Sequence, residues 1–316
     1  MTYFAEHGVG FSHDAVNRML RRDKLTPRLV WEHVKSDVIT SPKGCLIFDD
    51  TIIDKNHSHH IDLVRLQYSG NAHGLIKGIG MVNCLYVNPE SGQYWIIDYR
   101  LYDPERDGKS KLDHVREMLT RALSEKALPT STVLMDTWYA TKDMMVFIDA
   151  LKLTFICPIK ANRLVDDSAG KRPYRLPEDL DWQAHDILHG KTVKIHKFPN
   201  DFKVKLFRVA NSHRTDWIVT NDLSHDSSQG VQDACALRWK IEQFHRELKQ
   251  VTGVEKCQAR TGRIQRNHIV CAVLVWVRLT KLAREAATTI YQLKRDLLSN
   301  YLRNELRSPS LSMRSA

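Results

Sequence analysis

The chain has 316 residues, of which 42% are hydrophobic and 27% charged, and its net charge is +10. This length and composition are typical of one large or two small folded domains, and they exclude a wholly disordered protein. The longest apolar run, at 269–277, has nine residues. A bilayer-spanning helix needs about 20, so we expect no membrane contact.

The positive charge is concentrated near the end of the chain. From 231 to 316 there are sixteen Lys or Arg against seven Asp or Glu, which favours a polyanionic partner, above all nucleic acid, over a merely solvated surface. The six cysteines are scattered and no two have CxxC spacing, which argues against a zinc ribbon and a secreted disulfide framework. No signal-like apolar core opens the chain, so we expect a cytoplasmic protein.

The first part of the chain, 1–42, predicts a small helical region. Ser12 is suited to cap a first helix and Pro27 to open a second. Arg18 and Arg21 help to make the first helix basic. A DNA-binding helical unit and a charged helix pair packed on the main domain are both compatible with this pattern.

Residues 43–160 alternate between expected strands and helices. The strands are expected at 45–48, 75–87, 93–101, 132–135 and 153–160, and the helices at about 110–127 and 141–152. This order predicts an α/β fold in which a mixed sheet is flanked by helices. Two strands run into acids: the first into Asp49 and Asp50, and the strand at 132–135 into Asp136.

Residues 161–229 contain several Gly and Pro and short alternating strands, so we expect a β-rich insertion subdomain there. A helical C-terminal part, 230–306, follows. Its helices are expected at 234–252, about 262–286 and 288–306. The tail, 307–316, is expected to be disordered.

The helix expected at 234–252 combines an apolar stripe with a charged one. Arg238, Glu242, His245 and Lys249 stand at i, i+4, i+7 and i+11 and therefore share one narrow face. A carboxylate fixed on a packed helix is able to hold a metal ion, and cations beside it are able to hold phosphates. An ordinary ion pair between Arg238 and Glu242 is the alternative.

Asp49, Asp136 and Glu242 together predict a metal site. Strand ends of an α/β sheet are common positions for sites, and three converging carboxylates would repel one another unless divalent cations joined them. Mg²⁺ takes oxygen ligands, and two such ions would stabilise the attacking and leaving oxygens of a phosphodiester. For each acid taken alone, a turn, an N-cap or a solvated side chain is the alternative.

Three motifs carry a family resemblance. Arg238-x3-Glu242-x6-Lys249 matches the R-x3-E-x6-K part of the YREK signature, FDDT at 48–51 resembles the first-acid motif D-x-T, and VLMDTWY at 133–139 resembles a second-acid strand. Over about 44–306 the chain therefore resembles insertion-sequence transposases of the DDE type with a β-strand insertion before the catalytic Glu. The resemblance implies an RNase H-like core with Asp49, Asp136 and Glu242 as the metal-binding catalytic triad.

The resemblance also implies an activity. It is metal-dependent cleavage of double-stranded DNA at transposon ends, followed by strand transfer into target DNA. Two Mg²⁺ ions, replaceable by Mn²⁺, would be the cofactors. The implied active state is a homodimer on DNA, associated with the nucleoid of a bacterial cytoplasm.

Some alternatives stay open. Cys235 stands where the signature has Tyr, which puts one DNA contact or full activity in doubt. Adjacent strand residues point to opposite faces, so only one of Asp49 and Asp50 faces the site, and Asp50 is the alternative first acid. A catalytically decayed or repurposed transposase that only binds DNA is the alternative function. A cellular structure-selective nuclease of the same fold is a third.

Side chains expected to contact DNA lie mainly in the basic C-terminal part, where the resemblance implies that Arg238 and Lys249 hold phosphates near the cut. The complete set is Arg238, Lys240, His245, Arg246, Lys249, Lys256, Arg260, Arg263, Arg266 and Trp182. Trp138 is able either to stack on a base or to pack in the core. The group His57, His59 and His60 favours a solvated loop over a metal site.

Overall fold

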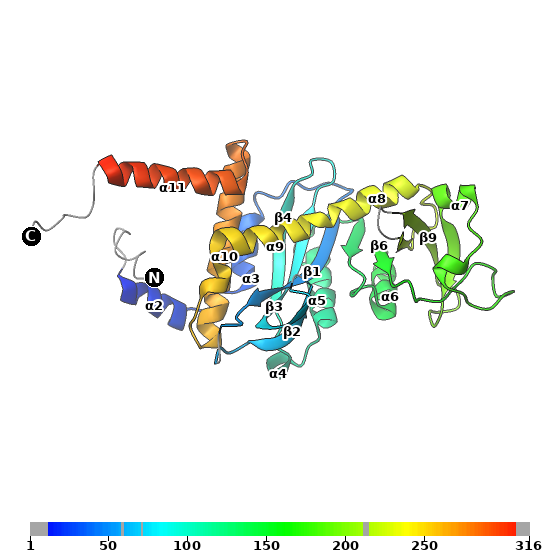
Figure 1. Ribbon diagram of the computed structural model, residues 1–316, viewed down its shortest axis with the longest axis horizontal. Coiled ribbons are helices and arrows are strands. Elements are labelled where there is room, and N and C mark those ends of the chain that lie inside the picture. Colours follow the sequence, from blue (N-terminus) through cyan, green and yellow to red (C-terminus); the bar gives the residue numbers. More distant parts are fainter. Residues whose placement is uncertain (1–11, 58–59, 71, 211–214, 308–316) are drawn as a thin grey trace, which may run out of the picture.

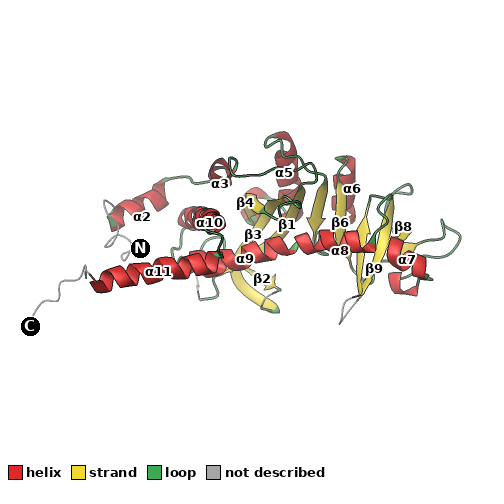
Figure 2. Ribbon diagram, turned by 90° about the horizontal axis from the view of Figure 1, so that it is seen from above, coloured by secondary structure: helices red, strands yellow, loops and turns green. Residues whose placement is uncertain are grey.

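A computed structural model describes residues 12–57, 60–70, 72–210 and 215–307 of the chain. One large mixed sheet runs through the molecule, and helices cover both of its faces (Figures 1 and 2). The predicted α/β class with a mixed, helix-flanked sheet is therefore confirmed.

Five of the first six strands form the core sheet and have the RNase H-like order. They lie side by side as β4-β3-β1-β5-β6, with β3 antiparallel to both β1 and β4, and with β5 parallel to both β1 and β6. A short strand, β2, forms a hairpin with the beginning of β3. The bounds are β1 (Cys45–Asp54), β2 (Arg65–Ser69), β3 (Gly74–Val87), β4 (Tyr94–Leu101), β5 (Thr132–Met135) and β6 (Thr154–Ile159).

The first acids do not end their strand, contrary to expectation. β1 is ten residues long and continues through Asp49 and Asp50 as far as Asp54. It is paired with β3 over its whole length, whereas its pairing with β5 ends where Phe48 lies opposite Met135. Asp49 and Asp50 therefore lie just beyond the end of the parallel ladder, in a part of β1 that is still paired with β3.

Three of the helices before and between these strands, α3, α5 and α6, pack against the sheet, whereas α2 contacts α10. The helix α2 begins after Ser12, whose hydroxyl accepts a hydrogen bond from the Ala15 N–H at 3.1 Å, and α3 begins at Pro27, as expected. α3 contacts β4, α5 contacts β3 and β4, and α6 contacts β6. The bounds are α2 (His13–Arg22), α3 (Pro27–Val34), α4 (Pro104–Asp107), α5 (Lys111–Ser124) and α6 (Lys142–Ala150).

The β-rich insertion extends the core sheet. Its last strand, β10, pairs antiparallel with β6, and the sheet then continues as β9, β8 and β7 (Figure 1). Phe207 and Trp217 are both buried, on opposite faces of this part of the sheet, because Phe207 lies opposite Ile218 in the ladder and Trp217 lies opposite Arg208. The bounds are β7 (Val165–Asp166), η1 (Pro177–Asp179), α7 (Ala184–His189), β8 (Lys191–Ile195), β9 (Lys203–Ala210) and β10 (Thr215–Thr220).

The C-terminal part is helical, as predicted, but the expected helix at 234–252 is part of a longer one. α8 starts earlier, after Ser227, whose hydroxyl accepts from the Gly230 N–H at 3.0 Å. Helical hydrogen bonding breaks at Arg238, although its backbone stays helical (φ −58°, ψ −29°). The bounds are α8 (Ser228–Leu237), α9 (Trp239–Thr252), η2 (Val254–Lys256), α10 (Gly262–Glu285) and α11 (Ile290–Arg307).

The packing of α9 orients its charged stripe. Ile241, Phe244 and Leu248 are fully buried against the core. α9 ends at Thr252 and is capped by Gly253, whose φ of 70° suits glycine. None of the helices in the described part of the chain is long and apolar enough to cross a lipid bilayer. The expected tail lies outside the described residues, apart from Arg307 at the end of α11.

Candidate active site

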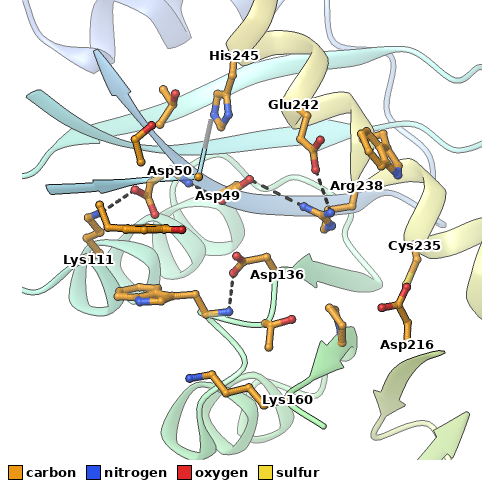
Figure 3. Close-up of a pocket in the computed structure, with 18 of the residues that line it drawn as sticks. Asp49, Asp50, Lys111, Asp136, Lys160, Asp216, Cys235, Arg238, Glu242 and His245 are labelled. Carbon is orange, nitrogen blue, oxygen red and sulfur yellow. Dashed lines mark hydrogen bonds and ion pairs between the residues drawn. The ribbon is translucent and has the colours of Figure 1, made fainter. Parts of the chain in front are cut away.

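The three predicted acids line one cavity of about 2020 Å³ between the sheet and α9 (Figure 3). Phe48 lies opposite Met135 in the parallel ladder of β1 and β5. Asp49 follows Phe48 within β1, and Asp136 follows Met135 directly after the end of β5, so the two acids come from neighbouring strands. Glu242 comes from the first turn of α9, which contacts β1. Three segments far apart in the sequence thus bring their carboxylates to the same hollow.

Asp49 is the most perturbed of these acids. Burial raises the pKa of its carboxyl to about 8, with further contributions from the negative charges of Asp136 and Asp50. Burial also raises the pKa of Asp136, although the backbone N–H groups of Tyr139 and Trp138 hold that carboxylate at 3.0 and 2.9 Å. The pair therefore favours either a retained proton or a bound cation.

Arg238 lies between the acids of the strand and the helix. Its Nη2 is 2.9 Å from Glu242 Oε1, and its Nη1 is 4.0 Å from Asp49 Oδ2. The i,i+4 ion pair of Arg238 with Glu242, one of the two interpretations of the sequence, is thus present. The same guanidinium also faces Asp49. Arg238 supplies positive charge at the centre of the acid group (Figure 3).

Asp50 also lines the cavity, contrary to the expectation that only one of the two adjacent acids faces it, but its environment differs from that of Asp49. Its Oδ2 accepts a hydrogen bond from Lys111 Nζ at 2.6 Å, and its Oδ1 accepts one from the Tyr139 hydroxyl at 2.7 Å. Both side-chain oxygens are therefore occupied by donors. Sequence reasoning missed Lys111, which no motif marks, whereas Tyr139 belongs to the quoted segment VLMDTWY.

His245 and Lys249 face the cavity wall rather than open solvent. His245 is buried, and burial lowers the pKa of its ring to about 3. Asn83 Nδ2 donates to His245 Nε2 at 2.9 Å, which leaves the proton of the neutral ring on Nδ1. Burial lowers the pKa of Lys249, whose Nζ lies 3.7 Å from Glu255 Oε1. Asn83 stands opposite Asp49 in the β1–β3 ladder, so it connects His245 to the acid-bearing strand.

Among the other expected DNA contacts, Arg246 is exposed and lines the cavity. Trp182 packs against Trp217 at 5.6 Å and donates from Nε1 to the Pro177 carbonyl at 2.9 Å. Arg266 is bound to Asp103 at 2.6 Å. The lining of this cavity does not include Trp182, Lys240, Lys256, Arg260, Arg263 or Arg266.

Lys240, Lys256, Arg260 and Arg263 lie elsewhere on the surface. Lys240 Nζ lies over the Tyr94 ring at 5.6 Å, and Arg263 Nη1 donates to the Asp23 carbonyl at 3.3 Å. Lys256 and Arg260 are exposed. Cys235 does line the cavity, and burial raises the pKa of its thiol to about 11.

Within the described ranges no group of three His, Cys, Asp or Glu side chains converges closely enough to hold a metal ion. Asp49 and Asp136 form a pair, while Glu242 is engaged by Arg238. His57 and His60 form no such group either, and His59 lies outside the described residues. The donor chemistry suits a hard cation, since every candidate ligand atom is a carboxylate oxygen.

Residues 40–278 match the family model described as the transposase DDE domain. A search of curated proteins finds no match.

Two solved structures illustrate the structural likeness. One is a piggyBac transposase in a synaptic complex with hairpin DNA. Its sequence is 12% identical to this one, the TM-score is 0.47, and the match covers 90% of this chain and 59% of the piggyBac chain. The chain thus spans less than two thirds of the length of that protein. The other is endonuclease V of Ciona intestinalis, in complex with a 24mer DNA containing an inosine followed by a ribo-adenosine. Its sequence is 12% identical to this one, the TM-score is 0.32, and the match covers 71% of this chain and 96% of the endonuclease chain.

Proposed function

The chain belongs to the family of transposases with a DDE domain, and we propose that it cuts DNA at transposon ends and joins the cut ends to target DNA. The observation that carries this proposal is the arrival of Asp49, Asp136 and Glu242 at one cavity from β1, the end of β5 and α9. The cavity is large enough to admit a nucleic acid strand, and Arg238, Arg246 and Lys249 line it with positive charge.

We propose that Asp49, Asp136 and Glu242 hold two Mg²⁺ ions, for which Mn²⁺ would substitute. Burial, and after it the negative charges of Asp136 and Asp50, raise the pKa of Asp49 to about 8, and a bound divalent cation would stabilise the ionised form against both effects. The bound ions would supply charge stabilisation to the attacking and leaving oxygens of the phosphodiester. Asp50 is a poorer candidate for the first acid because Lys111 and Tyr139 already occupy its oxygens.

In this proposal Arg238 changes partners when DNA enters. Its guanidinium is shared between Glu242 and Asp49, and a phosphate would accept the same two N–H groups bidentately. Transfer of Arg238 to the phosphate would free Glu242 to act as a ligand. Lys249 would hold a second phosphate as a point charge, and the Asn83–His245 hydrogen bond would keep α9 in position beside β1.

The test uses labelled duplexes from either side of the gene, incubated with the protein and Mg²⁺, Mn²⁺ or EDTA. We expect metal-dependent cleavage by the wild type and none by Glu242→Gln, with DNA binding by the variant nearly intact. Glu285→Gln, an exposed change on α10, is the matched control and should cleave normally. Full cleavage by Glu242→Gln would rule out its proposed role as a metal ligand.

The replacement of the family's Tyr by Cys235 favours a second candidate, a transposase that binds DNA without cutting it. The same incubation separates the two, because a binder shifts the labelled duplex without cleaving it in either metal.

The expected homodimer on DNA also stays a prediction. Light scattering of the complex with end DNA measures it.

A further inference from the structure

The two adjacent acids of β1 are directed toward different parts of the molecule. Figure 3 shows the Asp49 side chain directed toward Arg238 and the Asp50 side chain directed toward Lys111. Asp49 thus faces the junction of α8 and α9, and Asp50 faces the start of α5. This division leaves Asp50 without a role in the proposed chemistry, although it lines the same cavity.

Tyr139 connects Asp50 to the acid that follows the neighbouring strand. Its hydroxyl donates to Asp50 Oδ1 at 2.7 Å, and its backbone N–H donates to Asp136 Oδ1 at 3.0 Å. The Trp138 N–H donates to the same oxygen of Asp136 at 2.9 Å. One residue is therefore bonded both to the neighbour of Asp49 and to Asp136 itself.

The hydrogen bond between Tyr139 and Asp50 has a fixed donor and a fixed acceptor. Tyr139 is fully buried, and burial raises the pKa of its hydroxyl well above the ordinary value, so the hydroxyl keeps its proton and donates. The other oxygen of Asp50 accepts from Lys111 Nζ at 2.6 Å, and both of these side chains are largely shielded from water. A donor on each oxygen fixes the orientation of the carboxylate, and hydrogen bonds to carboxylates are stronger than neutral ones.

The bond lies where the sheet no longer holds the two acids together. The parallel ladder ends where Phe48 lies opposite Met135, and Asp136 comes after the end of β5. The negative charge of Asp136 contributes to the raised pKa of Asp49, so the two carboxylates repel each other. The Tyr139 hydroxyl crosses from the turn after β5 to β1 just beyond the ladder and opposes their separation.

We propose that Asp50 and Tyr139 are positioning residues, which hold Asp136 close enough to Asp49 for both carboxylates to bind one divalent cation. This inference rests on the proposed function and concerns the same site. In this role Asp50 is not a metal ligand, and Lys111 keeps its carboxylate turned toward Tyr139. Loss of a residue that orients a metal ligand typically weakens metal binding by about 10- to 100-fold.

The test measures Mn²⁺ affinity from the electron paramagnetic resonance signal of the free ion. It is made with the protein alone and with the protein on end DNA, after subtraction of the Mn²⁺ that the DNA binds by itself. Tyr139→Phe removes one hydroxyl and keeps the buried ring. It should weaken Mn²⁺ binding by about 10- to 100-fold and leave the affinity for end DNA in EDTA unchanged.

Tyr86→Phe is the matched control, because it also removes a hydroxyl from a fully buried ring. The Tyr86 hydroxyl donates to the carbonyls of Ser41 and Pro129, both at 3.1 Å, and Tyr86 does not line the cavity. The control should lower the melting temperature in EDTA but leave Mn²⁺ binding unchanged. Its comparison with Tyr139→Phe separates a loss of stability from a loss of ligand orientation.

Two further measurements examine whether Asp50 acts through Tyr139. Asp50→Ala removes the acceptor and should also weaken Mn²⁺ binding, and adding Tyr139→Phe to it should cause no further loss, because the same bond is already absent. In cleavage assays, Tyr139→Phe should need about 10- to 100-fold more Mn²⁺ for half of its maximal rate and recover at high Mn²⁺. Asp136→Asn, which lacks a proposed ligand, should not recover at any concentration.

The outcomes distinguish this inference from the proposed function. Wild-type Mn²⁺ affinity in Tyr139→Phe, or an equal loss in Tyr86→Phe, would overturn the inference while metal-dependent cleavage by the wild type still supported the proposed function. Independent, additive losses from Asp50→Ala and Tyr139→Phe would overturn it as well, because the two residues would then act separately. A wild type that binds no Mn²⁺ with or without end DNA would remove the proposed metal site itself.

Discussion

Asp49 and Asp50 are neighbours of the same type, and their surroundings separate their chemistry. Asp50 has a donor on each oxygen, from Lys111 and Tyr139. Asp49 is buried beside Asp136 and has Arg238 as its nearest cation, at 4.0 Å. The D-x-T spacing favours Asp49, but the sequence does not show how the surroundings of the two acids differ. Lys111, which binds Asp50, lies 61 positions farther along the chain. Donors contributed by the tertiary fold carry this distinction.

The raised pKa of Asp49 predicts how stability changes with pH in the absence of divalent metal. The folded state keeps a proton on this carboxyl up to about pH 8, whereas the ordinary value is 3.8. The resulting stabilisation is complete below pH 4 and is lost as the pH rises through 8. Asp49→Asn carries no such ionisation, so above pH 8 in EDTA it should melt about 4 °C higher than the wild type.

The comparison is made by thermal melts from pH 4 to pH 9, with Asp201→Asn, at an exposed carboxyl, as control. The difference between Asp49→Asn and the wild type should be smallest at the acid end and grow with pH. Mg²⁺ should then stabilise the wild type but not Asp49→Asn. A difference that does not depend on pH would show that Asp49 titrates normally.

Cys235 supports a second prediction at the scale of one side chain. It lines the cavity on α8, three residues before Arg238, and is partly buried. The wide cavity leaves room for a larger side chain, and a phenol there would be able to donate to a phosphate. Cys235→Tyr should therefore raise affinity for end DNA by about 10- to 100-fold, the usual worth of a hydrogen bond to a charged group.

Titration of labelled end DNA measures this effect, and Cys235→Phe is the control because it adds the ring without the hydroxyl. A gain for Tyr but not for Phe would identify the hydroxyl as the cause. A severe loss for both would mean that the cavity is built around the smaller thiol.

At the scale of elements, a buried lysine connects the acid-bearing strand to the end of the acid-bearing helix. Lys55, directly after β1, is fully buried, and its Nζ donates to the carbonyls of Glu255 and Cys257 at 2.6 and 2.9 Å. The Asp54 N–H donates to Glu255 Oε1 at 3.0 Å. Gln265 of α10 also donates to the Cys257 carbonyl, at 3.1 Å. These bonds hold η2, and with it the C-terminal end of α9, against β1.

Lys55→Met should lower the free energy of unfolding by about 1–3 kcal/mol, because the Glu255 carbonyl would lose its donor in a buried place. Methionine keeps most of the stem volume, so the change tests the hydrogen bonds rather than the packing. Urea unfolding measures the effect, with the exposed Lys43→Met as control. Unchanged or increased stability would mean that the cost of burying the ammonium outweighs the bonds it makes.

Sequence patterns predict most elements of this fold, and the failures have physical causes. The sequence predicts that the strand at 45–48 ends at two acids, because buried charge is normally excluded from strand interiors. β1 continues because Arg238 and Lys111 bring cations from distant parts of the chain to those acids. The sequence does not predict that α8 begins at Ser228, because the first residues of this helix show no helical periodicity of apolar side chains. The arrival of the three acids at one cavity follows from motif order, and the i,i+4 spacing predicts the ion pair of Arg238 with Glu242. The approach of Arg238 to Asp49 does not follow from the sequence.

At the scale of the whole molecule, the insertion is structurally continuous with the core. β6 lies between β5 and β10, and its pairing with β10 runs from Ile159 opposite Trp217 to Ile156 opposite Thr220. Trp217 and Ile218 also line the cavity beside Pro158 and Ile159. The insertion therefore both completes the sheet and forms one wall of the candidate active site.

Removal of the insertion should consequently damage the core as well. A variant in which a Gly/Ser linker replaces 161–221 would leave β6 as a bare apolar edge, and such edges pair with other chains. We expect it to elute as large aggregates in size-exclusion chromatography with light scattering. A shorter deletion, of 167–189, keeps β8, β9 and β10 in the sheet and should remain unaggregated, although less stable. If the larger deletion instead gave a soluble monomer with cooperative melting, β6 would not need β10, and the insertion would be an independent unit beside a self-sufficient core.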